Sequence, residues 1–112
     1  MEKLAMELGI IVEFFYLFHE GDMVEKIHMI YINSDADGVV INGGAWTHYS
    51  YAIMDALAML KIPIVEVHMS HVNNRESFRQ KSVISPVAKG QISGFGVNSY
   101  LLGLRAVYEL IN

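Results

Sequence analysis

Three side chains that could do chemistry stand at every second position near the middle of the chain: Glu66, His68 and Ser70. On a strand, residues at this spacing point to one side, so the Glu66 carboxylate can lie beside the His68 imidazole. A carboxylate there sets the tautomer of the imidazole and raises its basicity, as acid–base catalysis requires. The same residues also fit a strand-end histidine bonded to a loop carbonyl, and the motif alone leaves both interpretations open.

The stretch that carries these residues, 62–70, predicts a buried strand. It is short, rich in β-branched residues and has a proline at its second position, which fits a fully buried parallel strand better than a helix. In open parallel sheets, ligands bind beyond the carboxyl ends of the strands. We therefore expect a site at the end of this strand.

The rest of the chain alternates between helical and strand patterns. We predict helices at 1–8, 22–33, 50–60 and 97–111, strands at 10–15, 39–41 and 90–93, and a polar loop at 71–85. Gly9 ends the first helix, Asp22 is the expected N-cap of the second, and Tyr31 and Ile111 belong to inward helix faces. This alternation predicts one domain over 1–112, an α/β three-layer sandwich with a parallel sheet.

The composition limits the functional classes. Of the 112 residues, 53% are hydrophobic and 18% are charged, which is enough apolar material for one core. A net charge of -4 and the lack of a basic cluster argue against nucleic acid as a partner. The sequence has no cysteine, no apolar stretch of bilayer length and no signal-peptide pattern. We therefore expect a cytoplasmic protein that does not bind membranes.

Several segments together resemble the type II 3-dehydroquinate dehydratases. They are His-Glu-Gly at 19–21, Asn-Gly-Gly-Ala-Trp-Thr-His at 42–48, Asp-Ala-Leu at 55–57, the strand 62–70, Arg-Glu-Ser-Phe-Arg at 75–79 and Val-Ala-Lys-Gly at 87–90. Their order and spacing match that family over nearly the whole chain. The resemblance implies a flavodoxin-like fold, a homo-oligomer of trimers packed into a dodecamer, and dehydration of 3-dehydroquinate in the shikimate or quinate pathway without a metal or cofactor.

The resemblance also implies roles for individual residues. His68 would protonate the hydroxyl that leaves in an anti elimination through an enolate, and Glu66 would orient His68. Ser70 and backbone amides around Met69 would hold the substrate carboxylate. The ring hydroxyls would be bound by Asn42, His48 and Arg79, while Asp55 would reach into the site of a neighbouring subunit.

The outer residues of this set also have simpler interpretations. Asn42, which precedes two glycines, fits a turn, and His48 fits the start of a helix. Asp55 fits a charge on an exposed helix face. Arg75 and Arg79 lie one helical turn apart with a glutamate between them, which fits a surface ion-pair cluster. The joint match, and no single residue, favours the binding roles.

The resemblance does not extend to the N-terminal part of the family. Members begin with a strand and an Asn-Gly-Pro-Asn-Leu-Asn type of loop, followed by a mobile lid that carries the base tyrosine and an essential arginine. This sequence begins inside the next helix, and its six tyrosines occupy other parts of the pattern. Because the first strand is central in a flavodoxin-like sheet, we expect a rearranged sheet, a strand donated by another chain, or a coding sequence that starts upstream of Met1.

Two functional hypotheses follow. The first is a 3-dehydroquinate dehydratase that is active when the N-terminal segment is supplied. The second is a catalytically impaired homologue that serves as a ligand-binding or structural subunit. A third, an unrelated flavodoxin-like ligand binder, lacks support from a phosphate loop, because the pair Gly94 and Gly96 has no third glycine.

Overall fold

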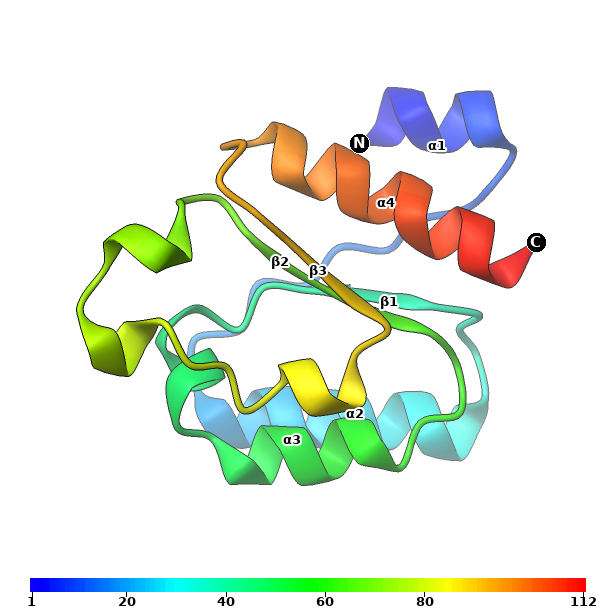
Figure 1. The fold of residues 1–112 in the computed structure, drawn as a ribbon. Helices are drawn as coiled ribbons and strands as arrows, with labels where there is room; N and C mark the ends of the chain where they lie inside the picture. The colour runs from blue at the N-terminus through cyan, green and yellow to red at the C-terminus, as the bar shows by residue number, and fades with distance from the viewer.

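In the computed structural model, the chain folds into helices on both faces of one small sheet (Figure 1). The helices are α1 (Glu2–Leu8), α2 (Glu20–Asn33), α3 (Tyr51–Ala58) and α4 (Asn98–Ile111), and the strands are β1 (Val39–Ile41), β2 (Ile64–His68) and β3 (Gly90–Ser93). The 3-10 turns are η1 (Gly44–His48), η2 (Val72–Asn74), η3 (Ser77–Arg79) and η4 (Ser85–Val87). The structure describes residues 1–112 except for the side chain of residue 73.

The three strands are parallel and lie in the order β1-β2-β3. Helices α1 and α4 cover one face of the sheet, and α2 and α3 cover the other (Figure 1). The predicted three-layer α/β sandwich is therefore confirmed. Because the strands are parallel, η1 after β1 and the polar loop after β2 lie at the same edge of the sheet, at the left of Figure 1.

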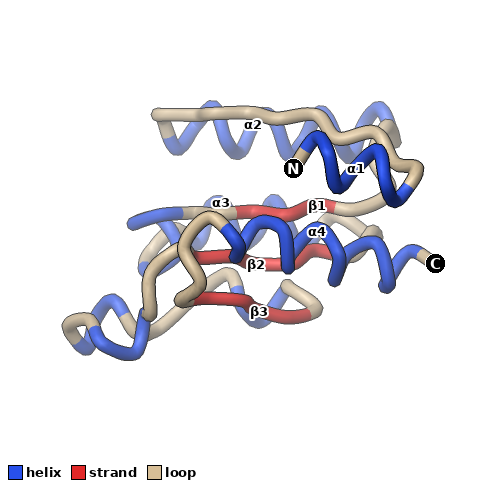
Figure 2. Tube along the Cα trace, turned by 90° about the horizontal axis from the view of Figure 1, so that it is seen from above, coloured by secondary structure: helices blue, strands red, loops and turns tan.

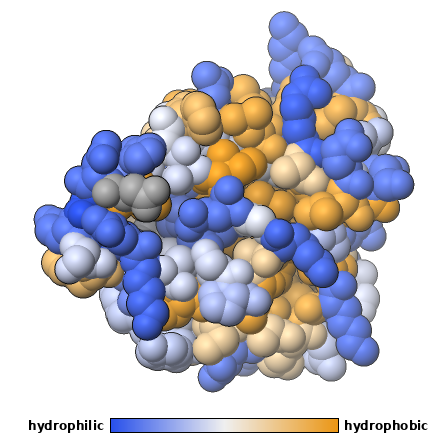
Figure 3. All heavy atoms as spheres, in the orientation of Figure 1, coloured by the Kyte–Doolittle hydropathy of each residue, from blue (hydrophilic) through white to orange (hydrophobic). Residues whose placement is uncertain are grey.

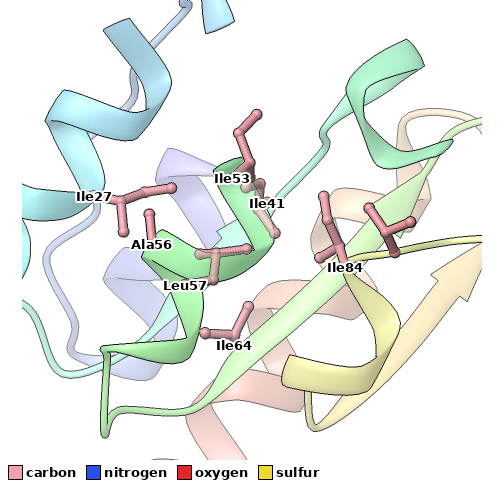
Figure 4. Packing of buried hydrophobic residues seen from close by; sticks show 8 residues of the cluster. Ile27, Ile41, Ile53, Ala56, Leu57, Ile64 and Ile84 are labelled. Carbon is pink, nitrogen blue, oxygen red and sulfur yellow. The ribbon is translucent and has the colours of Figure 1, made fainter. Parts of the chain in front are cut away.

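Strand β2 is the centre of the core, and all of its residues are buried. Val65 and Val67 belong to the apolar cluster under α1 and α4. Ile64 belongs to the cluster on the opposite face, which α2 and α3 cover (Figure 4). Because side chains alternate along a strand, Glu66 and His68 share the face of Ile64. The predicted common side of Glu66 and His68 is confirmed by their contact.

Some predicted helix details are wrong. Helix α2 begins at Glu20, and its N-cap is His19 instead of Asp22. The backbone of His19 is extended, and its carbonyl accepts the Asp22 amide at 3.1 Å, so Asp22 lies within the first turn. Tyr31 and Ile111 are 49% and 45% exposed. Each lies in the last turn of a 14-residue helix, Tyr31 in α2 and Ile111 in α4. Ile111 still faces inward in part, because a Cβ atom on Gly38, the residue before β1, would lie 3.0 Å from its Cδ1.

The predicted strand at 10–15 does not form. This segment runs extended beside the sheet, on the side of β1 away from β2 (Figure 2). Its residues from Ile11 to Phe18 make no backbone hydrogen bond to another described residue, and Tyr16 is 82% exposed. A strand needs a hydrogen-bonded neighbour, and in the described sheet β1 pairs only with β2. The prediction of a rearranged sheet is therefore wrong. A strand donated by another chain and a coding sequence that starts upstream of Met1 stay predictions.

Helix α4 lies close to the sheet because residue 103 is glycine. A Cβ atom on Gly103 would lie 2.6 Å from Val67 Cγ1 and 3.2 Å from Val40 Cγ1. Val67 has 0% exposure and belongs to the central strand, so it has little room to move. The missing side chain thus sets the distance between α4 and the strands that carry the candidate site.

We predict that Gly103→Ala lowers the free energy of unfolding by about 1–3 kcal/mol, because the added methyl group forces α4 away from the sheet. Gly21→Ala is the matched control, since Gly21 is also helical but a Cβ there meets no atom within 4 Å. Alanine at that position should be neutral or stabilise the protein by up to about 1 kcal/mol. Urea unfolding followed by circular dichroism measures both variants, and equal effects would contradict the prediction.

Candidate active site

The Glu66 carboxylate is buried near the carboxyl end of β2, with 0% exposure, and accepts hydrogen bonds from several segments. Nε2 of His68 lies 2.5 Å from Oε2. Ser82 Oγ lies 3.0 Å from Oε1 and 2.9 Å from Oε2, and Ser85 Oγ donates to Oε1 at 2.7 Å. Gln91 Nε2 donates to Oε2 at 3.1 Å. With these donors, the carboxylate is satisfied despite its burial.

These hydrogen bonds decide the charge of Glu66. Burial by itself raises the pKa of Glu66, but the bonds from His68, Ser85, Gln91 and Ser82 together lower that pKa below its usual value of 4.5. The carboxylate is therefore ionised near neutral pH and can only accept, so Nε2 of His68 carries a proton.

The second ring nitrogen of His68, Nδ1, bonds to no other described residue. The ring is 7% exposed, so a small part of it reaches the surface. Because Nε2 is committed to Glu66, Nδ1 is the ring nitrogen left for a ligand. The geometry thus suits transfer of a proton from Nδ1 to a bound molecule.

Met69 and Ser70 lie just beyond β2, and both are exposed. The Met69 carbonyl accepts the Gly96 amide at 2.9 Å, which joins the end of β2 to the turn before α4. The guanidinium group of Arg75 donates to Ser70 Oγ. Since Ser70 accepts from Arg75, its own proton is left for an acceptor such as a carboxylate.

His48 is the last residue of η1 and contacts the polar loop. Its Nδ1 lies 2.8 Å from the Lys81 carbonyl. A carbonyl only accepts, so Nδ1 carries the proton and Nε2 is left as an acceptor. The amide of Val83 donates to the Thr47 carbonyl at 2.8 Å and strengthens the same contact. The helix-start interpretation of His48 is wrong, because the N-cap of α3 is Ser50.

Asn42 follows β1 and is held from two sides. Its Oδ1 accepts the Gly44 amide at 2.9 Å, which is the turn that the simpler interpretation predicts. Its Nδ2 donates to the Tyr100 hydroxyl of α4 at 2.7 Å. An amide NH₂ group has two hydrogens, so one remains for a ligand. The turn and a binding role are therefore compatible.

Arg79 lies in η3, on the polar loop, where hydrophilic side chains gather (Figure 3). Its Nε is 3.2 Å from Glu76 Oε2, and the two side chains are 40% and 65% exposed. This is the predicted surface ion pair, and such pairs contribute about 0–1 kcal/mol. An open pocket of about 430 Å³ is lined by Asn74, Arg75, Glu76 and Arg79. Because Arg75 also bonds Ser70, the pocket adjoins the end of β2.

Asp55 is the one candidate that the fold keeps apart from these contacts. It is exposed on α3, and its side chain makes no hydrogen bond or ion pair with another described residue. The exposed-face interpretation therefore describes Asp55 within a single chain.

Sequence reasoning missed the residues that hold the candidates in place. They are Ser82, Ser85, Gln91 and Tyr100. A signal existed for Gln91, because in the parallel pairing of β2 with β3 it is the register partner of Glu66. The serines lie in a loop without periodicity, and nothing in their spacing points to Glu66.

The charges near the strand ends favour an anionic ligand, since two arginines, Arg75 and Arg79, and one acid, Glu76, line the pocket next to the end of β2 and leave it with an excess of positive charge. Among the described side chains, no three His, Asp or Glu residues come together as metal ligands. No helix in the described chain is long and apolar enough to cross a membrane.

We predict that Glu66→Gln destabilises the protein in a pH-dependent way. At neutral pH the loss of charge-assisted hydrogen bonds should lower the free energy of unfolding by about 2–4 kcal/mol. Because the folded pKa of Glu66 is lowered, its stabilising contribution is present above pH 4.5 and is lost as the pH falls through the folded pKa. The difference from the wild type should therefore shrink in acid.

Urea unfolding at a series of pH values from about 7 to about 3 measures this difference. Glu25→Gln on the exposed face of α2 is the control and should differ little from the wild type at any pH. A Glu66→Gln deficit that stays constant over this range would contradict the prediction.

Known proteins have similar sequences. The family model described as dehydroquinase class II matches residues 1–108. A 3-dehydroquinate dehydratase of Leptothrix cholodnii is 57% identical over 112 residues, which make up 100% of this chain and 74% of that protein. Another, of Syntrophotalea carbinolica, is 61% identical over 111 residues, or 99% of this chain and 74% of that protein.

A solved structure shares the fold as well. The crystal structure of a type II dehydroquinase from Butyrivibrio crossotus matches with a TM-score of 0.90 and 46% sequence identity. The match covers 95% of this chain and 73% of that chain. Sequence and fold together show that this chain belongs to the type II dehydroquinase family.

Proposed function

We propose that this chain is a 3-dehydroquinate dehydratase, a lyase that converts 3-dehydroquinate into 3-dehydroshikimate and water in the shikimate or quinate pathway. Its family and its relatives, which carry that name, support the reaction. Within the chain, the observation that carries the proposal is the buried contact of 2.5 Å between Glu66 and His68 at the end of β2.

The reaction needs a base and an acid. The base removes the proton beside the ketone, and the electron pair moves to the carbonyl oxygen to give an enolate. When the carbonyl forms again, the bond to the departing hydroxyl breaks, His68 Nδ1 gives that oxygen a proton, and water leaves. Glu66 orients the His68 ring through its contact with Nε2. By resemblance, the base is a tyrosine of the N-terminal lid, a segment without a counterpart in residues 1–112.

The substrate is a carboxylic acid with several hydroxyl groups, and the site offers complementary partners. Ser70 and the backbone amides around Met69 would bind the carboxylate, next to the positively charged pocket. The free amide hydrogen of Asn42 and Nε2 of His48 would bind ring hydroxyls, together with Arg79. Since Asn42 and His48 are already held by other residues, they need little reordering when the substrate binds.

We also propose that the protein is a cytoplasmic homo-oligomer, either a trimer or a dodecamer built from trimers. We further propose that it uses no metal or cofactor and binds neither nucleic acid nor membranes. Asp55, whose exposed side chain has no partner among the described residues, would then contact the site of a neighbouring subunit. Large exposed apolar side chains such as Phe95, at 61% exposure, support burial against another subunit.

We predict that His68→Gln lowers kcat by about a hundredfold to ten-thousandfold, because glutamine cannot transfer the proton. His28→Gln is the matched control, since His28 lies exposed on α2, and it should leave kcat unchanged. Arg79→Ala should mainly raise KM, because a ring hydroxyl loses its partner. The absorbance rise of the enone product after addition of 3-dehydroquinate measures all three.

The assay should be run on residues 1–112 and on the same chain extended upstream by the family's first strand and lid. Turnover by either form that depends on His68 supports the proposal. Binding of a dehydroquinate-like acid without turnover in both forms would contradict it and would favour the ligand-binding or structural subunit.

A further inference from the structure

The hydroxyl group of Ser82 is more constrained than any other neutral group near Glu66. Its Oγ lies 3.0 Å and 2.9 Å from the two carboxylate oxygens, and it accepts the amides of Ile84 at 3.1 Å and Ser85 at 3.0 Å. A serine hydroxyl has one proton and two lone pairs. The two amides occupy both lone pairs, so the proton must point to the carboxylate.

The other neutral donors lack this constraint. Ser85 Oγ reaches only Oε1, at 2.7 Å, and Gln91 reaches only Oε2, at 3.1 Å, from an exposed side chain on the edge strand β3. Ser82 alone among these three donors contacts both oxygens. It therefore defines how the carboxylate is turned, and with it the direction of the oxygen that accepts from His68.

Ser82 also lies in a segment that is fastened on both sides to η1. The carbonyl of Lys81 accepts from His48 Nδ1 at 2.8 Å, and the amide of Val83 donates to Thr47 at 2.8 Å. The chain at 81–83 thus joins the turn that carries His48 to the carboxylate that orients His68.

We propose that Ser82 is a positioning residue for His68: it directs its single proton at Glu66, holds that carboxylate in one orientation and so fixes which ring nitrogen of His68 faces the substrate. Among the described residues, the titratable group that contacts Glu66 is His68, and Ser82, Ser85 and Gln91 are neutral donors. The effect of Ser82 on Glu66 and His68 rests on geometry, whereas its effect on turnover also rests on the proposed function.

The test is Ser82→Ala, read by nuclear magnetic resonance without any substrate. Loss of a donor to the charged form should move the pH at which the Glu66 carboxyl carbon titrates up by about one pH unit. The ring nitrogens of His68 should change from one tautomer to a mixture of two, since the accepting oxygen is no longer held in one direction.

In the dehydratase assay, Ser82→Ala should lower kcat about tenfold with little change in KM, because the acid is misplaced while the binding groups stay. The acid limb of the pH profile of kcat should move to higher pH, in step with the carboxyl titration. Ser82→Thr keeps the hydroxyl and should restore the tautomer, the titration and most of kcat.

Ser99→Ala is the matched control. Ser99 is a serine with 0% exposure whose hydroxyl accepts the Phe95 amide at 3.1 Å and does not contact Glu66. Its loss should destabilise the protein without moving the Glu66 titration or the His68 tautomer. Ser82→Cys replaces the alanine variant if that variant does not fold, because it keeps the shape of serine with a much weaker donor.

Wild-type values for both the Glu66 titration and the His68 tautomer in folded Ser82→Ala or Ser82→Cys would overturn the proposal. Equal shifts in Ser99→Ala would overturn it too, since they would report general loosening. If the spectra change as expected but neither residues 1–112 nor the chain extended by the first strand and lid turns over 3-dehydroquinate, the proposed function fails and the positioning role of Ser82 stands.

Discussion

The burial of one carboxylate on the central strand constrains the edge of the sheet where the site lies. Removing a carboxylate from water costs several kcal/mol even after relaxation, and each hydrogen bond to a charged group returns about 1.5–3 kcal/mol. Glu66 needs several such bonds, and its donors come from β2, the polar loop, η4 and β3. The path of the chain between β2 and β3 is therefore set by the need to bring these donors together. Since stability alone does not require a buried carboxylate, the contact with His68 supports the orienting role proposed for Glu66.

The same requirement for partners explains why two apolar segments behave differently. Strand β2 is buried on both faces and hydrogen bonded on both edges. The segment 10–18 is also rich in apolar and aromatic residues, yet it makes no backbone pairing from Ile11 to Phe18 with the described residues and leaves Phe18 84% exposed. Strand propensity expresses how well a side chain fits a pleated surface. Without a neighbouring strand there is no such surface, and the propensity has no effect.

Periodic features of the sequence were therefore predictable, and features that depend on tertiary approach were not. The β-branched run before His68 indicated the central strand, and period-2 spacing indicated its contact with Glu66. The glycine at 9 indicated the end of α1, which is confirmed by its left-handed backbone. Ser82 and Tyr100 could not be found in this way, because each meets its partner across the fold. The strand at 10–15 was wrong for the same reason, since its formation depends on a neighbour that local pattern does not reveal.

The candidate site has one rigid part and one exposed part. His48 and His68 each use one ring nitrogen in a hydrogen bond within the protein and leave the other for a ligand, while Asn42 has both polar atoms bonded and leaves one amide hydrogen. Such groups are fixed before binding, and a proton transfer that depends on distances within a fraction of an ångström requires this. Arg79, in contrast, is held by a weak surface ion pair on the exposed loop. Charge acts over longer distances than a directed proton transfer and tolerates this looseness. In the proposed function, the sheet edge therefore supplies the groups that must be placed accurately, and the loop supplies the charge that would attract the anionic substrate to them.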